Sequence, residues 1–167
     1  ASREAGAQPV IALNYLSVED DLRVAVDAMR FTRRIMQAPA LARFGSDELK
    51  REWLTPTLTG ELVCSIAVSE PGAGSDVAGI KTRAVKQGDH YILNGSKTFI
   101  TNGINADLVI VVAQTDPEKG ALGFSLLAVE RGMEGFERGR HLDKIGLDGQ
   151  DTAGLSFTDV KVPAENL

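Results

Sequence analysis

Cysteine and histidine are scarce in this 167-residue sequence, and each shortage excludes a class of site. The lone cysteine, Cys64, excludes an internal disulfide and any metal site built from several cysteines, and it fits a reducing compartment. The two histidines, His90 and His141, do not stand at metal-ligand spacing from another candidate ligand. We therefore expect no metal site, and we expect both histidines at the surface.

Long hydrophobic runs, an excess of basic residues and the common phosphate-binding loops are also missing. No apolar run approaches the roughly 18 residues that a membrane span needs, and residues 1–9 lack the apolar region of a signal peptide. The net charge is −5, which argues against a general affinity for nucleic acid. Neither GxxxxGK[ST] nor GxGxxG occurs, and nothing localises a Ser-His-Asp triad. These absences predict a cytoplasmic protein without membrane or nucleic-acid partners.

The first 56 residues have the apolar spacing of helices. Ser17 is suited to cap a helix that ends at Ala38-Pro39, and a shorter helix is predicted from Ser46 to Leu54, ending before Pro56. Three basic residues gather near the end of the first helix, and a solvated helix end is favoured there over an anion site: Arg30, Arg33 and Arg34. We interpret residues 1–56 as a helical lead segment, electrically neutral as a whole.

From Leu62 onward the apolar period changes to two, which is typical of half-buried strands. Turns are predicted at Gln87–Asp89 and at Asn94-Gly95. The predicted strands are 63–68, 80–85, 91–93, 98–100, 108–113, 124–129 and 155–160. Short strands separated by glycine or proline turns indicate a mainly β domain, an antiparallel barrel or sandwich, preceded by a short α-helical segment. Its expected bounds are residues 57–167.

Two polar segments are candidates for ligand binding. In residues 67–76, a strand ends in a loop whose glycines allow close approach of backbone N–H groups, and Ser69 and Ser75 add hydroxyls. In residues 99–103, Phe99 and Thr101 share one face of a strand, so they offer a ring and a hydroxyl together. Glycine-rich turns after strands are usually plain turns, so the residues by themselves favour that interpretation and give only a weak indication of a ligand.

Three segments carry a family resemblance, in order and with the family's spacing. Residues 67–79, AVSEPGAGSDVAG, resemble the first signature of the acyl-CoA dehydrogenases at every constrained position. Residues 95–103, GSKTFITNG, are similar to the second flavin-contacting strand of that family. The end of its middle β domain resembles residues 142–146, 151–152 and 157–163. The resemblance covers about residues 40–167.

The resemblance implies an FAD enzyme that desaturates an acyl-CoA thioester between its α and β carbons. A carboxylate would remove the α proton while a β hydride passes to flavin N5. Phe99 would lie against the isoalloxazine ring, Thr101 would bond near N5, and Ser75 would contact the CoA portion. The implied cofactor-binding residues are Ile66, Ala67, Val68, Ser69, Phe99, Ile100 and Thr101.

The sequence departs from the family pattern at both ends. The family's catalytic glutamate lies in a C-terminal helical domain, so we expect the base to be missing from this sequence; Glu70 belongs to the signature loop and is no substitute. Residues 8–42 resemble a C-terminal segment of the glucose-methanol-choline flavin oxidoreductases instead of the family's N-terminal helices. This indicates a fusion of two enzyme fragments, with a divergent N-terminal helix as the alternative.

Three functions of different classes follow from the sequence. The leading hypothesis is the flavin- and acyl-CoA-binding portion of an FAD-dependent acyl-CoA dehydrogenase. The alternatives are a non-catalytic flavin or CoA-binding module, and a structural fragment whose β domain self-associates. The resemblance implies an acyl-CoA substrate, an electron-transferring flavoprotein as partner, a homo-oligomer, and the cytoplasm or, in a eukaryote, the mitochondrial matrix.

Overall fold

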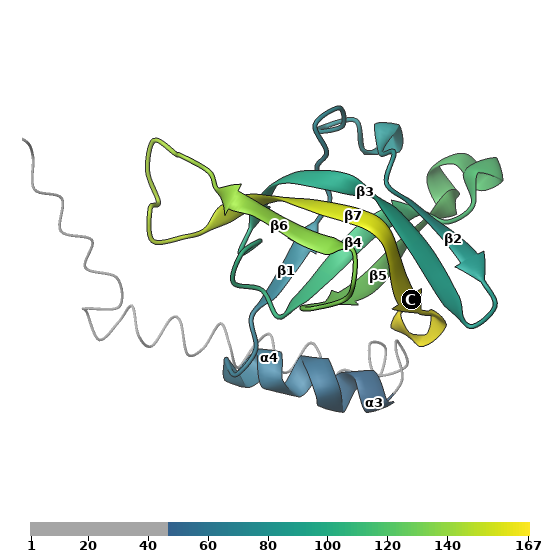
Figure 1. Ribbon diagram of the computed structural model, residues 1–167, viewed down its shortest axis with the longest axis horizontal. Coiled ribbons are helices and arrows are strands. Elements are labelled where there is room, and N and C mark those ends of the chain that lie inside the picture. Colours follow the sequence, from purple (N-terminus) through teal and green to yellow (C-terminus); the bar gives the residue numbers. More distant parts are fainter. Residues whose placement is uncertain (1–46) are drawn as a thin grey trace, which may run out of the picture. The chain divides into compact units, whose positions relative to one another are not determined.

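The computed structural model of the chain describes residues 47–167 (Figure 1). The helix predicted from Ser17 to Ala38-Pro39, its arginine cluster and the segment at 8–42 lie outside the described residues. The described residues form a compact unit that begins at Asp47. The predicted division of the chain after residue 56 stays a prediction.

A short helical stretch precedes the strands, as predicted, but it continues past the expected end. It comprises α3 (Asp47–Leu49), a π-helical turn (Lys50–Leu54) and α4 (Thr55–Thr59). The prediction that it ends before Pro56 is wrong. Pro56 lies in the first turn of α4, where a residue without a backbone N–H leaves no helical hydrogen bond unmade. Gly60, with φ of 81°, ends the helix in the left-handed conformation.

Seven strands follow the helix, which confirms the mainly β fold. They are β1 (Cys64–Ala67), β2 (Arg83–Gln87), β3 (His90–Thr101), β4 (Leu108–Gln114), β5 (Phe124–Glu130), β6 (Phe136–His141) and β7 (Thr152–Pro163). Short 3₁₀ turns occupy Val77–Gly79, Pro117–Gly123 and Ala164–Asn166. Among the described residues, no helix is long and apolar enough to cross a membrane.

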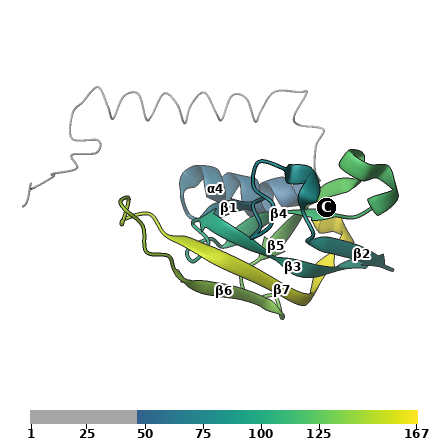
Figure 2. The same ribbon diagram turned by 90° about the horizontal axis from the view of Figure 1, so that it is seen from above.

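The strands form one curled sheet, seen from two directions in Figures 1 and 2. Four of its pairings are antiparallel: β2 with β3, β3 with β7, β6 with β7, and β4 with β5. Two pairings are parallel, those of β1 and of β2 with β4. Since β5 pairs along the other side of β4, both β1 and β2 lie on the same side of it. The chain therefore leaves the sheet after β1, forms the loop 68–82 and rejoins the same side of β4 as β2.

The core lies on one face of this curled sheet, because apolar side chains alternate along its strands. On β4, Val109 and Val111 are fully buried, and they lie opposite Val129 and Leu127 of β5. Phe157 of β7 joins the same cluster and stacks on a partly buried ring, Phe136, with ring centroids 5.1 Å apart. The buried face holds the strands in register, since a one-residue slip would expose every one of these side chains.

Two local predictions in the β region are wrong. Residues 80–82 are not part of β2, because the backbone N–H groups of Lys81 and Thr82 donate to the Glu70 carboxylate instead of joining a ladder. The predicted turn at Asn94-Gly95 is absent, and β3 runs straight through it. Asn94 is hydrogen-bonded to Asp159 of β7. The Asn94-Gly95 dipeptide, which is typical of hairpin turns, therefore makes a cross-strand contact here.

Strand β6 was not predicted. Its sequence, FERGRH, has no apolar alternation, and most of its residues are exposed. It forms a strand because its backbone pairs with β7, starting at Phe136 opposite Phe157. A backbone pairing that buries few side chains leaves no periodic signal in the sequence.

Candidate functional site

A cleft of about 320 Å³ opens between the end of β1 and the end of β3. These strands do not pair as a ladder, and individual hydrogen bonds connect β3 to β1 and to the residues that follow β1. Ser65 Oγ donates to the Thr101 carbonyl oxygen at 2.5 Å, and the Thr98 N–H donates to the Ser69 carbonyl oxygen at 2.9 Å. The lining residues are Cys64, Ser65, Ile66, Val68, Ser69, Phe99, Ile100, Thr101 and Asn102.

A β-bulge in β3 turns Phe99 toward the cleft. Between Lys97 and Ile100, three steps along β3 match two steps along β7, so β3 carries one extra residue. Lys97 and Ile100 are both buried as a result, whereas Phe99 is 71% exposed. Phe99 has φ of 57°, a left-handed conformation that is costly for a bulky residue. Such strain is typical of positions where a side chain is directed at a functional site.

The cleft combines apolar walls with hydroxyl groups. Ile66 on β1, 61% exposed, and Phe99 on β3 supply apolar surface, while Ser69 and Thr101 supply hydroxyls that donate or accept hydrogen bonds. A flat, largely apolar ligand with polar atoms on its rim matches this combination.

The structure brings most of the predicted site residues together, with two exceptions. Ala67 is fully buried on β1, so its side chain points into the core and only its backbone is near the cleft. Ser75 is exposed in the loop 68–82 and is not among the residues that line the cleft. The remaining six all line it: Ile66, Val68, Ser69, Phe99, Ile100 and Thr101.

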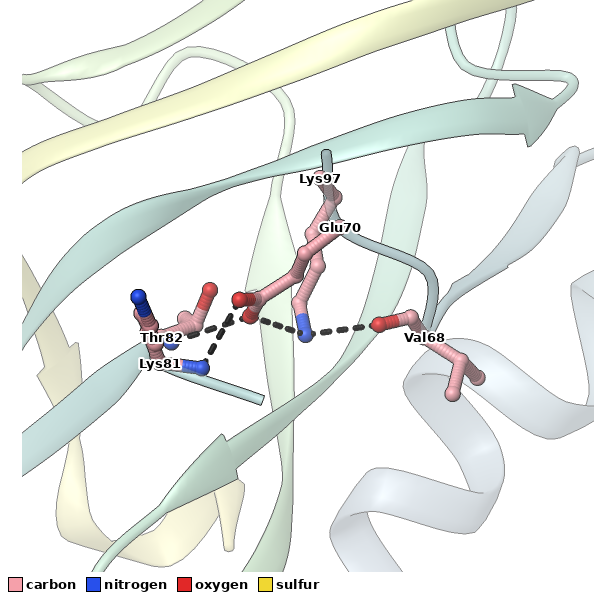
Figure 3. A network of polar contacts seen from close by, with 5 residues as sticks. All are labelled: Val68, Glu70, Lys81, Thr82 and Lys97. Atoms are coloured by element: carbon pink, nitrogen blue, oxygen red, sulfur yellow. Dashed lines mark hydrogen bonds and ion pairs between the residues drawn. The ribbon is translucent and has the colours of Figure 1, made fainter. Parts of the chain in front are cut away.

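A buried ion pair, Lys97–Glu70, is hydrogen-bonded to a residue of the cleft, Val68 (Figure 3). Lys97 Nζ donates to Glu70 Oε1 at 3.0 Å and to the carbonyl oxygen of Val68, a residue of the cleft, at 2.9 Å. The Glu70 carboxylate also accepts the backbone N–H groups of Lys81 at 2.7 Å and Thr82 at 2.9 Å. The side chain of Lys97 is fully buried and that of Glu70 is 7% exposed.

Burial and hydrogen bonding act in opposite directions on this pair. For Glu70, burial favours the neutral acid, but hydrogen bonds from the backbone N–H groups of Lys81 and Thr82 and from Lys97 hold its pKa below the ordinary value. Burial lowers the pKa of Lys97, and Glu70 offsets this only in part. The Glu70 carboxylate is thus hydrogen-bonded to its neighbours and does not line the cleft, so it is not placed to act as a base there.

Several residues at the site were missed by sequence reasoning. Lys97 stands four residues after the buried Leu93, so strand alternation places both side chains on the inward face. A charged residue at an inward position predicts a buried partner, and this could have been used. Asp151 is also buried: it accepts the Ile104 N–H at 2.7 Å and the Asn105 side chain at 2.8 Å, which shapes the turn after β3. Cys64 and Ser65 line the cleft without a signal of their own, and Asn102 lines it from within the candidate segment 99–103.

Neither histidine lines this cleft. His90 is partly buried at the start of β3, 2.9 Å from the Asp89 carboxylate, and His141 is exposed at the end of β6. In the described part of the chain, no group of three or more histidine, cysteine, aspartate or glutamate side chains is arranged to hold a metal ion.

Comparisons with known proteins match this domain. The profile of the acyl-CoA dehydrogenase middle domain matches residues 65–160. The mitochondrial long-chain specific acyl-CoA dehydrogenase of Sus scrofa is 51% identical over 131 residues, covering 77% of this chain and 30% of the relative. The crystal structure of an acyl-CoA dehydrogenase from Geobacillus kaustophilus superposes with a TM-score of 0.72 and 57% identity, over 78% of this chain and 35% of the other. A solved FAD-dependent dehydrogenase is 35% identical with a TM-score of 0.71, over 73% and 33% of the two chains.

These comparisons also show how much of its relatives the chain corresponds to. It spans about a third of the length of the relatives that it matches. They give no support to the predicted resemblance of residues 8–42 to the glucose-methanol-choline oxidoreductases. The profile match covers more than half of the chain and includes both segments that form the cleft. The chain belongs to the acyl-CoA dehydrogenase family, and residues 65–160 are its middle domain.

Proposed function

We propose that this chain is the flavin- and acyl-CoA-binding portion of an FAD-dependent acyl-CoA dehydrogenase, which desaturates an acyl-CoA thioester between its α and β carbons. The observation that carries the proposal is the exposed ring of Phe99, held by a strained bulge beside the hydroxyl of Thr101 and opposite Ile66. The family membership and the relatedness to a solved FAD-dependent dehydrogenase support FAD as the cofactor.

Each proposed contact follows from the chemistry of the cleft. The Phe99 ring and Ile66 cover the flat apolar surface of the isoalloxazine, where stacking and burial stabilise binding. The Ser69 hydroxyl and the backbone N–H groups of residues 66–69 bond its pyrimidine edge, and Thr101 bonds near N5. Such donors stabilise the negative charge that a reduced flavin carries. The flavin would accept the β hydride of the substrate.

The remaining assignments concern groups outside the cleft. Ser75, exposed in the loop 68–82, is proposed to contact the CoA portion of the substrate. An acyl-CoA substrate is supported by the names of the relatives. Electron-transferring flavoprotein is the proposed electron acceptor, and a similar solved structure carries that name. No described residue is assigned as the base for α-proton removal. A homo-oligomer, and a location in the cytoplasm or the mitochondrial matrix, complete the proposal.

The test is flavin retention by the 167-residue chain. The chain is incubated with FAD, separated by gel filtration and examined by visible absorption; a co-eluting flavin band is expected. Phe99→Ala should weaken retention at least tenfold, and Thr101→Val should weaken it less while altering the flavin spectrum, because it keeps the shape but removes the hydroxyl. Leu122→Ala is the matched control, since Leu122 is an exposed apolar residue that does not line the cleft.

The other outcomes of this experiment distinguish the alternative functions. Flavin retention with no change of the flavin spectrum on addition of acyl-CoA would favour a module that binds flavin alone. A colourless peak whose size increases with concentration would favour a structural fragment that self-associates. Retention that is unaffected by Phe99→Ala would overturn the placement of flavin in this cleft.

A further inference from the structure

The buried Lys97–Glu70 pair joins three separate stretches of chain at one point (Figure 3). Lys97 comes from β3, Glu70 from the start of the loop 68–82, and Glu70 in turn binds Lys81 and Thr82 at the end of that loop. The fourth connection runs from Lys97 Nζ to the Val68 carbonyl oxygen. Both ends of the loop are therefore tied to the same lysine.

Stability alone is a weak reason for such a pair. Removing two charges from water costs several kcal/mol per ion, and well-packed apolar residues of similar volume often serve as well or better. Directional bonds are what the pair supplies and apolar residues cannot. Here they are aimed at the backbone on one wall of the cleft, because Val68 lines it and the next residue, Ser69, is bonded to Thr98.

We propose that Lys97 and Glu70 are positioning residues of the flavin site, a role that rests on the proposed function. Lys97 holds the Val68 carbonyl oxygen, and Glu70 holds the far end of the loop, so that Val68 and Ser69 face Phe99 and Thr101 across the cleft. Neither side chain touches the ligand, because both are buried and neither lines the cleft.

The position of Lys97 relative to the bulge strengthens this inference. Lys97 is the last residue of β3 in register before the extra residue, and Thr98, within the bulge, donates to Ser69. The loop wall and the Phe99 wall are thus attached to one another through two adjacent residues of β3. A change at Lys97 should alter the distance between the two walls of the cleft.

The first test separates local positioning from global stability without any ligand. Hydrogen exchange is followed by NMR at the Thr98 and Lys81 amides and at the amides of β4, in the wild type, Lys97→Met and Asn166→Ala. Asn166 is a matched control because it is a buried polar residue whose bonds join the C-terminal turn to β5, away from the cleft. Relative to the β4 amides, the Thr98 and Lys81 amides should exchange at least tenfold faster in Lys97→Met only.

The second test measures FAD binding by fluorescence titration of the same three proteins and of Lys97→Met/Glu70→Gln. Lys97→Met should raise Kd at least tenfold, and Asn166→Ala should leave it within twofold. The double variant should unfold no more easily than Lys97→Met, because the unpaired buried carboxylate is gone, yet it should bind FAD no better.

Three results have distinct meanings. The positioning role is overturned if the Thr98 and Lys81 amides exchange no faster in Lys97→Met than in Asn166→Ala. It is also overturned if the double variant regains FAD affinity together with stability, since the effect would then be one of folding alone. A wild type that binds no FAD contradicts the proposed function, while the exchange experiment still decides whether the pair positions the loop.

Discussion

The antiparallel pair β3–β7 carries two β-bulges, and each contains a residue in the strained left-handed conformation. The two bulges differ in the contacts that compensate this strain. In the first, β7 holds the extra residue between Val160 and Phe157, and Asp159 takes φ of 51°. In the second, β3 holds the extra residue, and Phe99 takes φ of 57°. The two bulges offset one another in register, so both strands of 12 residues stay paired over their length.

The difference between them lies in what compensates the strain. Asn94 bonds both the side chain and the backbone N–H of Asp159, each at 2.9 Å, so the first bulge is stabilised within the protein. Phe99 is 71% exposed, and its ring gains little from packing in the described structure. A strained, exposed aromatic residue beside a cleft is typical of a ligand-binding site, whereas the first bulge has a structural role.

The largest effect is expected at Gly95, opposite the first bulge. A Cβ at this position would lie 2.4 Å from Thr82 Oγ1 and 2.7 Å from its backbone Cα, and Gly95 has φ of 148°. Gly95→Ala should lower the free energy of unfolding by about 3 kcal/mol, measured by urea denaturation. Gly88→Ala is the control, because Gly88 has a positive φ but no neighbouring atoms, and should cost about 1 kcal/mol. Equal losses would show that the clash with Thr82 is unimportant.

The next effect concerns the two bonds that stabilise the first bulge. Asn94→Ala removes both hydrogen bonds to Asp159 and should lower the free energy of unfolding by about 1.5 kcal/mol, by the same measurement. Flavin retention should be unchanged, since Asn94 is not among the residues lining the cleft. A loss of retention larger than that of stability would remove the functional distinction between the two bulges.

A smaller change should separate strain from function at the second bulge. Phe99→Gly and Phe99→Ala both remove the ring, but only glycine adopts the left-handed conformation without steric cost. Phe99→Gly should therefore be more stable than Phe99→Ala by about 1 kcal/mol, in thermal and urea unfolding. The two variants should be equally deficient in flavin retention. Better retention by the alanine variant would contradict the proposal that the ring, and not the backbone, binds the ligand.

The smallest expected effect is a pH dependence beside the second bulge. The pKa of Glu70 lies below its ordinary value of 4.5 in the folded chain, so the unfolded chain binds the proton more readily. Its contribution to stability is present above that ordinary value and is lost as the pH falls through the lowered pKa. The stability advantage of the wild type over Glu70→Gln, compared by urea unfolding at pH 7 and pH 3, should shrink at pH 3. An unchanged advantage would mean that the charge of the Glu70 carboxylate contributes nothing to the stability of the Lys97–Glu70 pair.

Most strands were predictable because they bury alternate apolar residues. The predicted strands at 108–113 and 124–129 correspond to β4 and β5, whose inward residues form the core. The predicted strand at 63–68 contains β1. The continuation of the helix past Pro56, the start of β2 and the whole of β6 were not predictable in this way. Each depends on a backbone hydrogen bond to a distant partner, or on the absence of one, and such bonds leave no periodic trace.

The candidate site was predictable in composition but not in geometry. The signature at 67–79 and the segment 95–103 carry a resemblance strong enough to name the cofactor that they imply. Simple alternation from the buried Leu93, however, would place Phe99 and Thr101 on the inward face with Lys97. The extra residue in β3 reverses this, and it exposes the ring and the hydroxyl together.

The sequence by itself determined the class of fold, the family and the residue types of the cleft, because each depends on local pattern. Only the tertiary structure decided that β1 and β3 lie near one another without pairing and line a cleft, that Lys97 and Glu70 meet beside it, and that Phe99 is exposed. These features depend on contacts between residues some 30 positions apart, such as Lys97 and Val68, and on strand register. Register is set by the packing of the whole sheet, and no single segment contains that information.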